Sequence, residues 1–263
     1  MFMLVIWLQG VWLPLHGYSF ESTPLWAGIY ILPLTAGFLI AGPASGWLSD
    51  HFGSRPFATG GMLAAAATFG LLMLLPADFN YVWFALLLLA NGLAMGMFTS
   101  PNTAGIMNSV PASQRGAASG MRATFQNSGM TLSIGLFFTI MMIGMATDLP
   151  MALAHGLTTQ GVSASKAAAI SKLPPVSVLF AAFMGYNPIE SLLGPSLKTL
   201  APSHVAILTS GSFFANLISA PFLHGLSIIF TFSLIMCLIA AVASWLRGGK
   251  ALAGTGSNGR GSS

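Results

Sequence analysis

Residues 81–107 have the sequence YVWFALLLLANGLAMGMFTSPNTAGIM and contain no Asp, Glu, Lys or Arg. A membrane-spanning helix needs about 20 mostly apolar residues to cross a hydrocarbon core of roughly 30 Å. Four further stretches meet this criterion, namely residues 24–48, 57–76, 123–146 and 222–246. Together these stretches predict a protein with several membrane-spanning helices.

The composition of the whole chain agrees with this prediction. The 263 residues are 55% hydrophobic and 5% charged, with 9 Lys and Arg and 5 Asp and Glu. Soluble domains carry about 25% charged residues, so the composition excludes an ordinary soluble enzyme. The cations are dispersed along the chain, and the net charge of +4 therefore indicates membrane sidedness and no nucleic-acid partner.

A sixth apolar stretch, residues 2–18, begins directly after the first methionine. At 1.5 Å per residue it reaches only about 26 Å, so we expect a first helix that is cut short. A signal peptide would need a positive n-region and a cleavage site, and this stretch has neither. We therefore favour a truncated chain over a signal peptide. Six spans place six cations on one side, which the positive-inside rule makes cytoplasmic. These cations are Arg55, Arg115, Arg122, Arg247, Lys250 and Arg260.

The predicted organisation is a six-helix bundle over residues 1–247 and a Gly/Ser-rich flexible tail over 248–263. A long outer loop is expected over 148–203, in which the short apolar segment 176–186 would form an interfacial or packed element. Residues 204–220 are expected to lie along the outer surface, because a seventh span would reverse the side of the C-terminal cations. The prediction is a multi-pass protein of the cell (plasma or inner) membrane with both termini in the cytoplasm.

A polar motif, GWLSDHFGSRP at residues 46–56, joins the second and third expected spans. Gly46 allows a neighbouring helix to approach closely, and Gly53 can adopt the positive φ of a tight turn. Asp50 can accept hydrogen bonds from the next helix N-terminus or pair with Arg55, Arg115 or Arg122. An ordinary helix hairpin with a capping Asp explains the motif equally well.

The pattern Gly46-x-x-x-Asp50-x-x-Gly53-x-Arg55 resembles the loop between the second and third helices in each half of major facilitator superfamily transporters. The flanking stretches 7–50 and 115–135 are similar to the C-terminal half of the fourteen-helix drug:proton antiporter (multidrug efflux) subfamily, and the similarity covers nearly the whole chain. It implies one six-helix bundle, half of the transporter fold, in the lipid bilayer. It also implies a small hydrophobic or cationic substrate, protons, and either a missing N-terminal bundle or a second copy as partner.

The same resemblance implies a gating role for the motif. Asp50 and Arg55 would latch helices in one access state, and Arg122 would complete the latch. A snorkelling anchor at the membrane edge explains Arg122 at least as well. His51 stands where the family usually has Arg or Lys, which predicts a weaker or pH-dependent charge network.

Polar uncharged residues within the expected spans are candidates for the substrate path, because in hydrocarbon they face other helices or a water-filled cavity. Interhelical hydrogen bonds explain each of them equally well. No expected span holds Asp or Glu, so the proton-carrying carboxylate of an antiporter is expected in the missing half. The candidates are Gln9, Asn91, Asn102, Gln126 and Asn127.

The histidines lack metal-ligand spacing, and no nucleophile motif is present, so we predict no enzyme activity, no metal and no cofactor. The predicted protein is an all-α membrane transporter for drug or small-molecule efflux by proton antiport, or a half of one, inactive without a second bundle. Two alternatives remain open. One is a half-transporter that acts as a homodimer or heterodimer, and the other is a non-transporting membrane assembly or regulatory protein that binds partners through residues 148–203.

Overall fold

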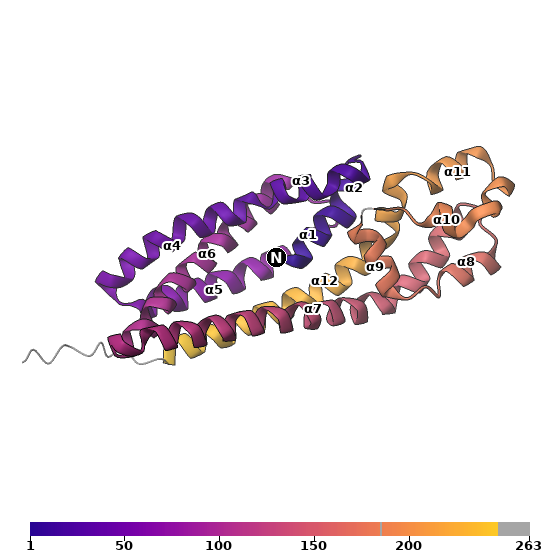
Figure 1. Ribbon diagram of the computed structural model, residues 1–263. Helices are drawn as coiled ribbons and strands as arrows, with labels where there is room; N and C mark the ends of the chain where they lie inside the picture. Colours follow the sequence, from indigo (N-terminus) through magenta and orange to yellow (C-terminus); the bar gives the residue numbers. More distant parts are fainter. Residues whose placement is uncertain (185, 247–263) are drawn as a thin grey trace, which may run out of the picture.

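The computed structural model describes residues 1–184 and 186–246 of the chain. Within these residues the secondary structure is helical, without strands, which confirms the all-α membrane fold. Long helices form an elongated bundle, and a group of short helices lies at one end of it (Figure 1). The tail at 248–263 and the cations Arg247, Lys250 and Arg260 fall outside the described residues.

The first half of the chain contains most of the bundle. Its elements are α1 (Phe2–Trp7), the π-helical turn η1 (Leu8–Trp12), α2 (Leu13–Leu15), η2 (Phe20–Ser22), α3 (Thr23–Tyr30), α4 (Leu32–Phe52), α5 (Ser54–Leu72) and α6 (Tyr81–Asn108).

The second half consists of two very long helices and the short helices between them. Its elements are η3 (Ala112–Gln114), α7 (Arg115–Thr159), α8 (Ala164–Ile170), α9 (Pro175–Phe183), α10 (Ile189–Leu193), η4 (Gly194–Thr199), α11 (Pro202–Leu208) and α12 (Gly211–Leu246).

Four helices of the described chain are long and apolar enough to cross a membrane. The six spans expected from the sequence therefore stay a prediction. A fifth span results if α8 and α9, which meet at a bend of 81°, are taken together. The first apolar helix covers only Phe2–Leu15, and α5 has 19 residues but is not among the four. The four are Thr23–Phe52, Tyr81–Asn108, Ala112–Thr159 and Gly211–Leu246.

The two long helices differ from the sequence-based boundaries. Residues 148–159 were expected in the outer loop, but they continue α7, and the Asp148 carboxylate there lies 2.6 Å from Nδ1 of His224. The buried residues Leu149, Leu153 and Leu157 give this part of the helix an apolar face that packs in the core. Residues 211–220 were expected as a separate surface segment, but they form the first turns of α12. This helix continues through Pro221. A proline removes only one backbone hydrogen bond, and packing against neighbouring helices can keep such a turn helical in a membrane.

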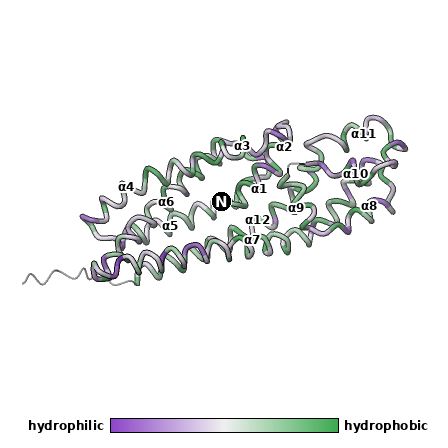
Figure 2. Tube along the Cα trace, viewed as in Figure 1, coloured by the Kyte–Doolittle hydropathy of each residue, from purple (hydrophilic) through white to green (hydrophobic). Residues whose placement is uncertain are grey.

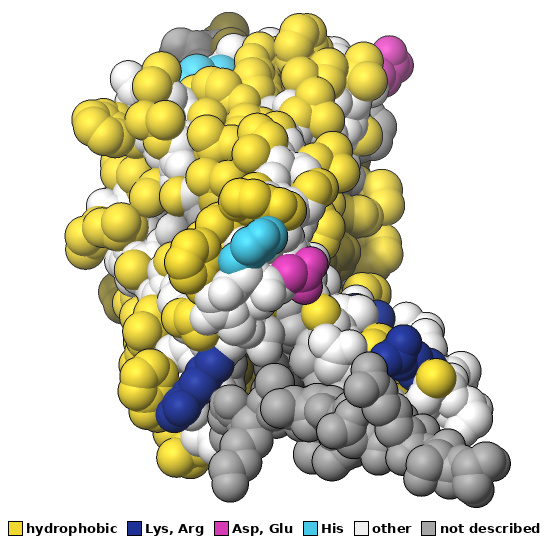
Figure 3. All heavy atoms as spheres, turned by 90° about the vertical axis from the view of Figure 1, so that its left-hand side faces the viewer, with side chains coloured by type: hydrophobic (Ala, Val, Ile, Leu, Met, Phe, Trp, Pro, Cys, Tyr) yellow, Lys and Arg dark blue, Asp and Glu magenta, His cyan; other side chains and the backbone are white. Residues whose placement is uncertain are grey.

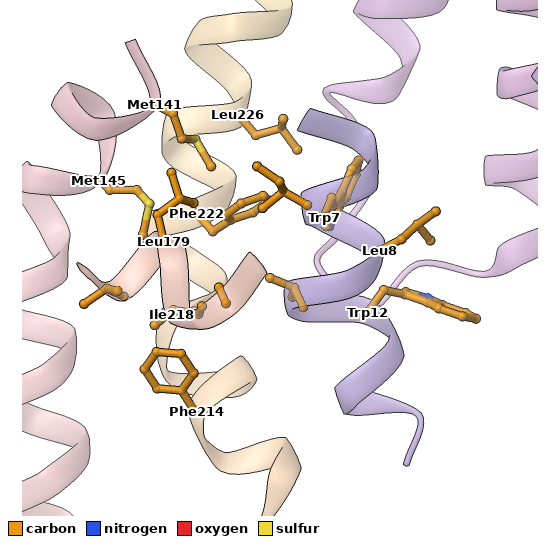
Figure 4. Packing of buried hydrophobic residues seen from close by; sticks show 14 of the residues in the cluster. Trp7, Leu8, Trp12, Met141, Met145, Leu179, Phe214, Ile218, Phe222 and Leu226 are labelled. Atoms are coloured by element: carbon orange, nitrogen blue, oxygen red, sulfur yellow. The ribbon is translucent and has the colours of Figure 1, made fainter. Parts of the chain in front are cut away.

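The main hydrophobic core lies where α1 and η1 meet α7, α9 and α12 (Figure 4). Trp7 is fully buried there and packs edge-on against Phe84 at 5.7 Å between ring centroids. Met141 and Met145 of α7 face Phe222 of α12. The apolar segment expected at 176–186 contributes α9, whose Val178, Leu179 and Ala182 are buried in this core.

Helices α4 and α6 approach each other at backbone distance. A methyl group added to Gly92 would collide with the carbonyl group of Leu34 and lie 3.0 Å from the Phe38 nitrogen. One added to Gly96 would lie 2.9 Å from the Phe38 oxygen. The hydroxyl group of Ser45 donates to the Gly96 carbonyl at 3.2 Å across the same interface. These small residues therefore allow the two helices to touch.

The lateral surface of the bundle is apolar. Hydrophobic residues run along the long helices, whereas hydrophilic residues gather near the helix ends (Figure 2). A view of the end with the α4–α5 connection shows hydrophobic side chains over much of the surface and few charged ones (Figure 3). Exposed side chains such as Leu39, Trp83 and Val242 are suited to lipid, because lipid tails are as apolar as leucine.

Helix α7 is packed along only part of its length. Its buried residues begin at Met141 and recur on one face up to Leu157, where α7 runs beside α12. From Arg115 to Ile140 no residue of α7 is buried. Gly116 and Gly120, which have the spacing of a helix-packing motif, have nothing within 4 Å of an added methyl group. Helix α7 contacts α12 already at Phe137, whose ring centroid lies 6.0 Å from that of Phe232. The first half of α7, before Phe137, therefore presents a largely exposed helix face in the described chain.

Candidate functional site

The polar motif at 46–56 forms the tight turn between α4 and α5. Gly53 ends α4 and precedes α5 with φ 87° and ψ 151°, which confirms the expected positive φ. An added methyl group at Gly46 would lie 2.8 Å from the Ser100 hydroxyl of α6. Gly46 is therefore a contact point between α4 and α6, as the sequence predicted.

Asp50 and Arg55 lie on either side of this turn but do not form an ion pair. Asp50 is exposed in the last turn of α4, and Arg55 lies in the first turn of α5. Each charge is near the unfavourable end of its own helix dipole, so the dipoles do not stabilise either of them. The two histidine–carboxylate pairs found among the described residues, His16–Asp78 and His224–Asp148, lie outside this turn. The latch role stays a prediction.

Arg55 is held by an aromatic ring of α12. Its guanidinium carbon lies 4.4 Å from the centroid of the Trp245 ring, which is the geometry of a cation–π interaction. The Nε atom of Arg55 is buried without a hydrogen-bond partner. The ring therefore replaces a carboxylate as the partner of this cation, and it connects the turn to the end of α12.

Replacing Trp245 with Leu should weaken this connection. We expect a loss of about 0.5–1 kcal/mol in the free energy of unfolding, the range for an exposed cation–π pair. Trp245→Phe keeps an aromatic face and should lose less. A double-mutant cycle with Arg55→Gln, followed by thermal unfolding in detergent, measures the coupling. Equal losses for Trp245→Leu in the presence and absence of Arg55 would contradict the interaction.

The other charged candidates are spread over separate elements. His51 lies four residues after Trp47 on α4, and the two rings are tilted by 47° with their centroids 4.7 Å apart. Nδ1 of His51 lies 2.9 Å from the Trp47 carbonyl oxygen. Arg122 is half-buried on α7. The described structure therefore does not bring Arg122 into an ion pair with Asp50.

The five candidates for the substrate path fall into different environments. Asn91 is buried on α6 and donates to the Thr68 hydroxyl of α5 at 2.6 Å, which is an interhelical hydrogen bond. Gln9 is buried in η1, and Asn102 is half-buried on α6. Gln126 and Asn127 are exposed on the unpartnered half of α7. The structure therefore does not gather these residues into one site.

Two small cavities lie within the described chain, with volumes of about 50 and 100 Å³, and none of the five candidates lines them. The larger is apolar and lies under α9 and α10. Drug-sized pockets have volumes of about 300–1,000 Å³, so neither cavity can enclose such a compound.

Comparison with known proteins identifies the family. The model of the Major Facilitator Superfamily matches residues 1–134, which include the α4–α5 turn and the first exposed turns of α7. The chain belongs to the Major Facilitator Superfamily. No solved structure shows significant similarity to it.

Three relatives within this superfamily illustrate the similarity. The tetracenomycin C resistance and export protein of Streptomyces glaucescens is 25% identical over 93% of this chain and 40% of its own length. The methyl viologen resistance protein SmvA of Salmonella typhimurium is 33% identical over 46% of this chain and 24% of its own length. The uncharacterized MFS-type transporter YhcA of Bacillus subtilis is 31% identical over 53% of this chain and 25% of its own length. The chain thus spans 40% or less of the length of these relatives.

Sequence reasoning missed several residues of this major facilitator bundle. Trp245 and Thr68 gave no signal, because their partners are remote in sequence and are brought close by α5 packing against α12 and α6. Asp148 was assigned to a loop, but it lies on α7, where it contacts His224. Its signal was the apolar sequence on both sides, which is typical of a continuous helix.

Proposed function

We propose that this chain is one helical bundle of an exporter that moves small hydrophobic or cationic compounds out of the cell in exchange for protons. It acts together with a second bundle, and the substrate path runs between the two along the first half of α7. Lipid surrounds the rest of the bundle, and the α4–α5 turn and both termini face the cytoplasm of the plasma or inner membrane. Asp50, Arg55 and Arg122 act at the cytoplasmic end of this path.

The unpartnered half of α7 carries this proposal. No residue from Arg115 to Ile140 is buried, yet the stretch contains the polar side chains of Gln126 and Asn127. Polar groups on a membrane helix face protein or a water-filled cavity, because exposure to lipid leaves them without hydrogen-bond partners. A second bundle placed against this face would give Gln126 and Asn127 such an environment.

The relatives support the same reading of the function. One is named for tetracenomycin C resistance and export, and another for methyl viologen resistance. The first is more than twice as long as the part that matches this chain. Because major facilitator transport depends on one bundle rocking against another, the second bundle is either carried by a longer polypeptide or supplied by a second copy.

Cross-linking tests the proposed interface. The chain has one cysteine, the buried Cys237, so Cys237→Ala gives a background without thiols. We expect Gln126→Cys to form a cross-link in native membranes, whereas Trp83→Cys, which is 65% exposed on α6, should form none. A product of twice the mass identifies a second copy, and a product of another mass identifies a different bundle. Equal reaction at both positions, or no reaction at Gln126→Cys, would contradict the interface.

Export itself is tested in vesicles. The isolated chain should give no uncoupler-sensitive export of methyl viologen, whereas vesicles that contain the unmodified chain together with the partner identified by cross-linking should give it. Uncoupler-sensitive export by the monomer would show that the second bundle is unnecessary. An intact assembly that exports no cationic or hydrophobic dye would favour the non-transporting alternative.

A further inference from the structure

An imidazole and a carboxylate meet between the two longest helices. Nδ1 of His224 on α12 lies 2.6 Å from Oδ2 of Asp148 on α7. The side chains are 45% and 43% exposed, so water reaches both. A carboxylate oxygen can only accept, so Nδ1 of His224 carries the proton that is donated to Asp148.

This pair lies next to a backbone contact between α7 and α12. A methyl group added to Gly144 would lie 2.5 Å from the Cα atom of Gly225. Gly225 directly follows His224, and Asp148 is one helical turn after Gly144. The ionisable pair therefore acts next to a contact between two backbones, where a small change in attraction moves whole helices.

Both helices contain a proline within one turn of the pair. Pro150 follows Asp148 in α7, and Pro221 precedes His224 in α12. Each proline removes one backbone hydrogen bond, which makes bending easier at that point. Beyond these prolines lies the dome, which we define as residues 149–220 and which comprises the end of α7, α8 to α11 and the start of α12. The pair thus lies at the two joints that connect the dome to the bundle.

The pair lies at the end of the bundle opposite the α4–α5 turn. Asp148 is about 39 Å along α7 from Arg122, and His224 is about 33 Å along α12 from Leu246 at 1.5 Å per residue. A hydrocarbon core is roughly 30 Å thick. With Arg122 at one membrane surface, the pair therefore lies at the opposite surface, within reach of water there.

Other ionisable groups near the dome have their own partners or lie apart. The elements α9, η1 and α1, which pack on α7 and α12, contain no ionisable side chain. Four of the remaining groups are His16 after α2, paired with Asp78 at 3.5 Å; Lys166 on α8, bonded to the Leu193 oxygen and Ser196; His204 on α11, 3.1 Å from Gln160; and His155, exposed on α7. The dome also contains Lys172 after α8, Glu190 on α10 and Lys198 on η4, and all three are exposed.

We propose that His224 and Asp148 form a proton-binding site whose occupancy sets the position of the dome relative to the bundle. A proton from water on that side binds Nε2 of His224, and the ring becomes positively charged while Nδ1–H still donates to Asp148. Because an imidazole changes charge between pH 5 and 8, the attraction between α7 and α12 is stronger at pH 5.5 than at pH 8. The site lies in this chain, although no carboxylate was expected on its spans.

Spin-label distances test the proposal without any transport. Labels at Leu74→Cys, after α5, and Ala168→Cys, on α8 in the dome, are placed on exposed positions in the Cys237→Ala chain in lipid nanodiscs. We expect one narrow distance distribution at pH 5.5 and a broader or shifted one at pH 8. The ratio of the population with the narrow distance to the remaining population should change by about 1.4- to fivefold between the two pH values, the range for an exposed ion pair.

Four variants separate the pair from other effects. His224→Gln and Asp148→Asn should give the broad distribution at both pH values, whereas His224→Lys, which keeps a positive charge, should stay narrow at both. His16→Gln is the matched control, because it removes the other His–Asp pair and should leave the pH response unchanged. A pH response that persists in His224→Gln, or an absent response in the unmodified pair, would overturn the proposal.

The role of the site in export rests on the proposed function, and the two can fail separately. If the distances respond to pH but no assembly exports, the proton site stands and the proposed function fails. If export occurs and its pH profile is the same in His224→Gln as in His16→Gln, the proposed function stands. The proton site is then unrelated to export.

Discussion

Gly92→Ala should destabilise the bundle by about 1–3 kcal/mol or more, the cost of overpacking a close contact. The added methyl group would collide with the carbonyl group of Leu34 and lie 3.0 Å from the nitrogen of Phe38. Both are backbone atoms of α4, so no side chain can rotate away. The helices must separate, and the nearby Ser45–Gly96 hydrogen bond would lengthen with them. Thermal unfolding of the purified chain in detergent measures the loss.

Gly120→Ala is the matched control for this substitution. Gly120 lies in a helix as Gly92 does, but an added methyl group there has nothing within 4 Å. Because Ala is favoured over Gly in helices by about 1 kcal/mol, this variant should be neutral or slightly more stable. The two substitutions should therefore change stability in opposite directions. A Gly92→Ala variant as stable as Gly120→Ala would show that α4 and α6 are not in backbone contact.

Gly53→Ala should lower the free energy of unfolding by about 1–3 kcal/mol, because only glycine adopts its backbone conformation without strain. Gly53 has φ 87° and ψ 151° and joins α4 directly to α5. The strain would be relieved by opening the turn, which would also move Arg55 away from the Trp245 ring, 4.4 Å from it. Denaturation of the purified variant and loss of the Arg55–Trp245 coupling energy are the two measurements.

Two further variants test the conformational reason. Gly60→Ala, on α5 with nothing within 4 Å and no positive φ, should be neutral or stabilising. Gly53→Asn should not restore stability, because asparagine tolerates the left-handed helical region, whereas ψ 151° lies far from it. Full stability in Gly53→Asn would mean that the turn relaxes easily to another conformation.

Much of the fold could be predicted because hydrocarbon imposes a simple demand on sequence. A spanning segment must satisfy its backbone internally and present apolar side chains, and residues 81–107 and 222–246 do so in a form visible without any partner. The turn at 46–56 was also predictable, since glycine is the residue that adopts a positive φ most readily, and Gly53 does so at the end of α4. These predictions depend on local chemistry alone.

Helix ends and partners could not be predicted in the same way. Asp148 and Pro150 are loop signals by local rules, but His224, 76 positions away, meets the carboxylate at 2.6 Å and α7 continues. Gly116 and Gly120 have the same spacing as Gly92 and Gly96, yet only the second pair touches another helix. Spacing shows that a close contact is possible, and only the packing of helices decides where it occurs.

The sequence by itself determined that this protein is helical, lies in a membrane and has the α4–α5 turn of its superfamily, because these follow from hydropathy and from short-range backbone rules. The tertiary structure alone decided that Arg55 faces Trp245, that Asn91 bonds Thr68, and that Asp148 meets His224. Each of these contacts joins two helices. The physical reason is that directional contacts act over a few ångströms, so they exist only after apolar burial and backbone packing have brought distant segments together.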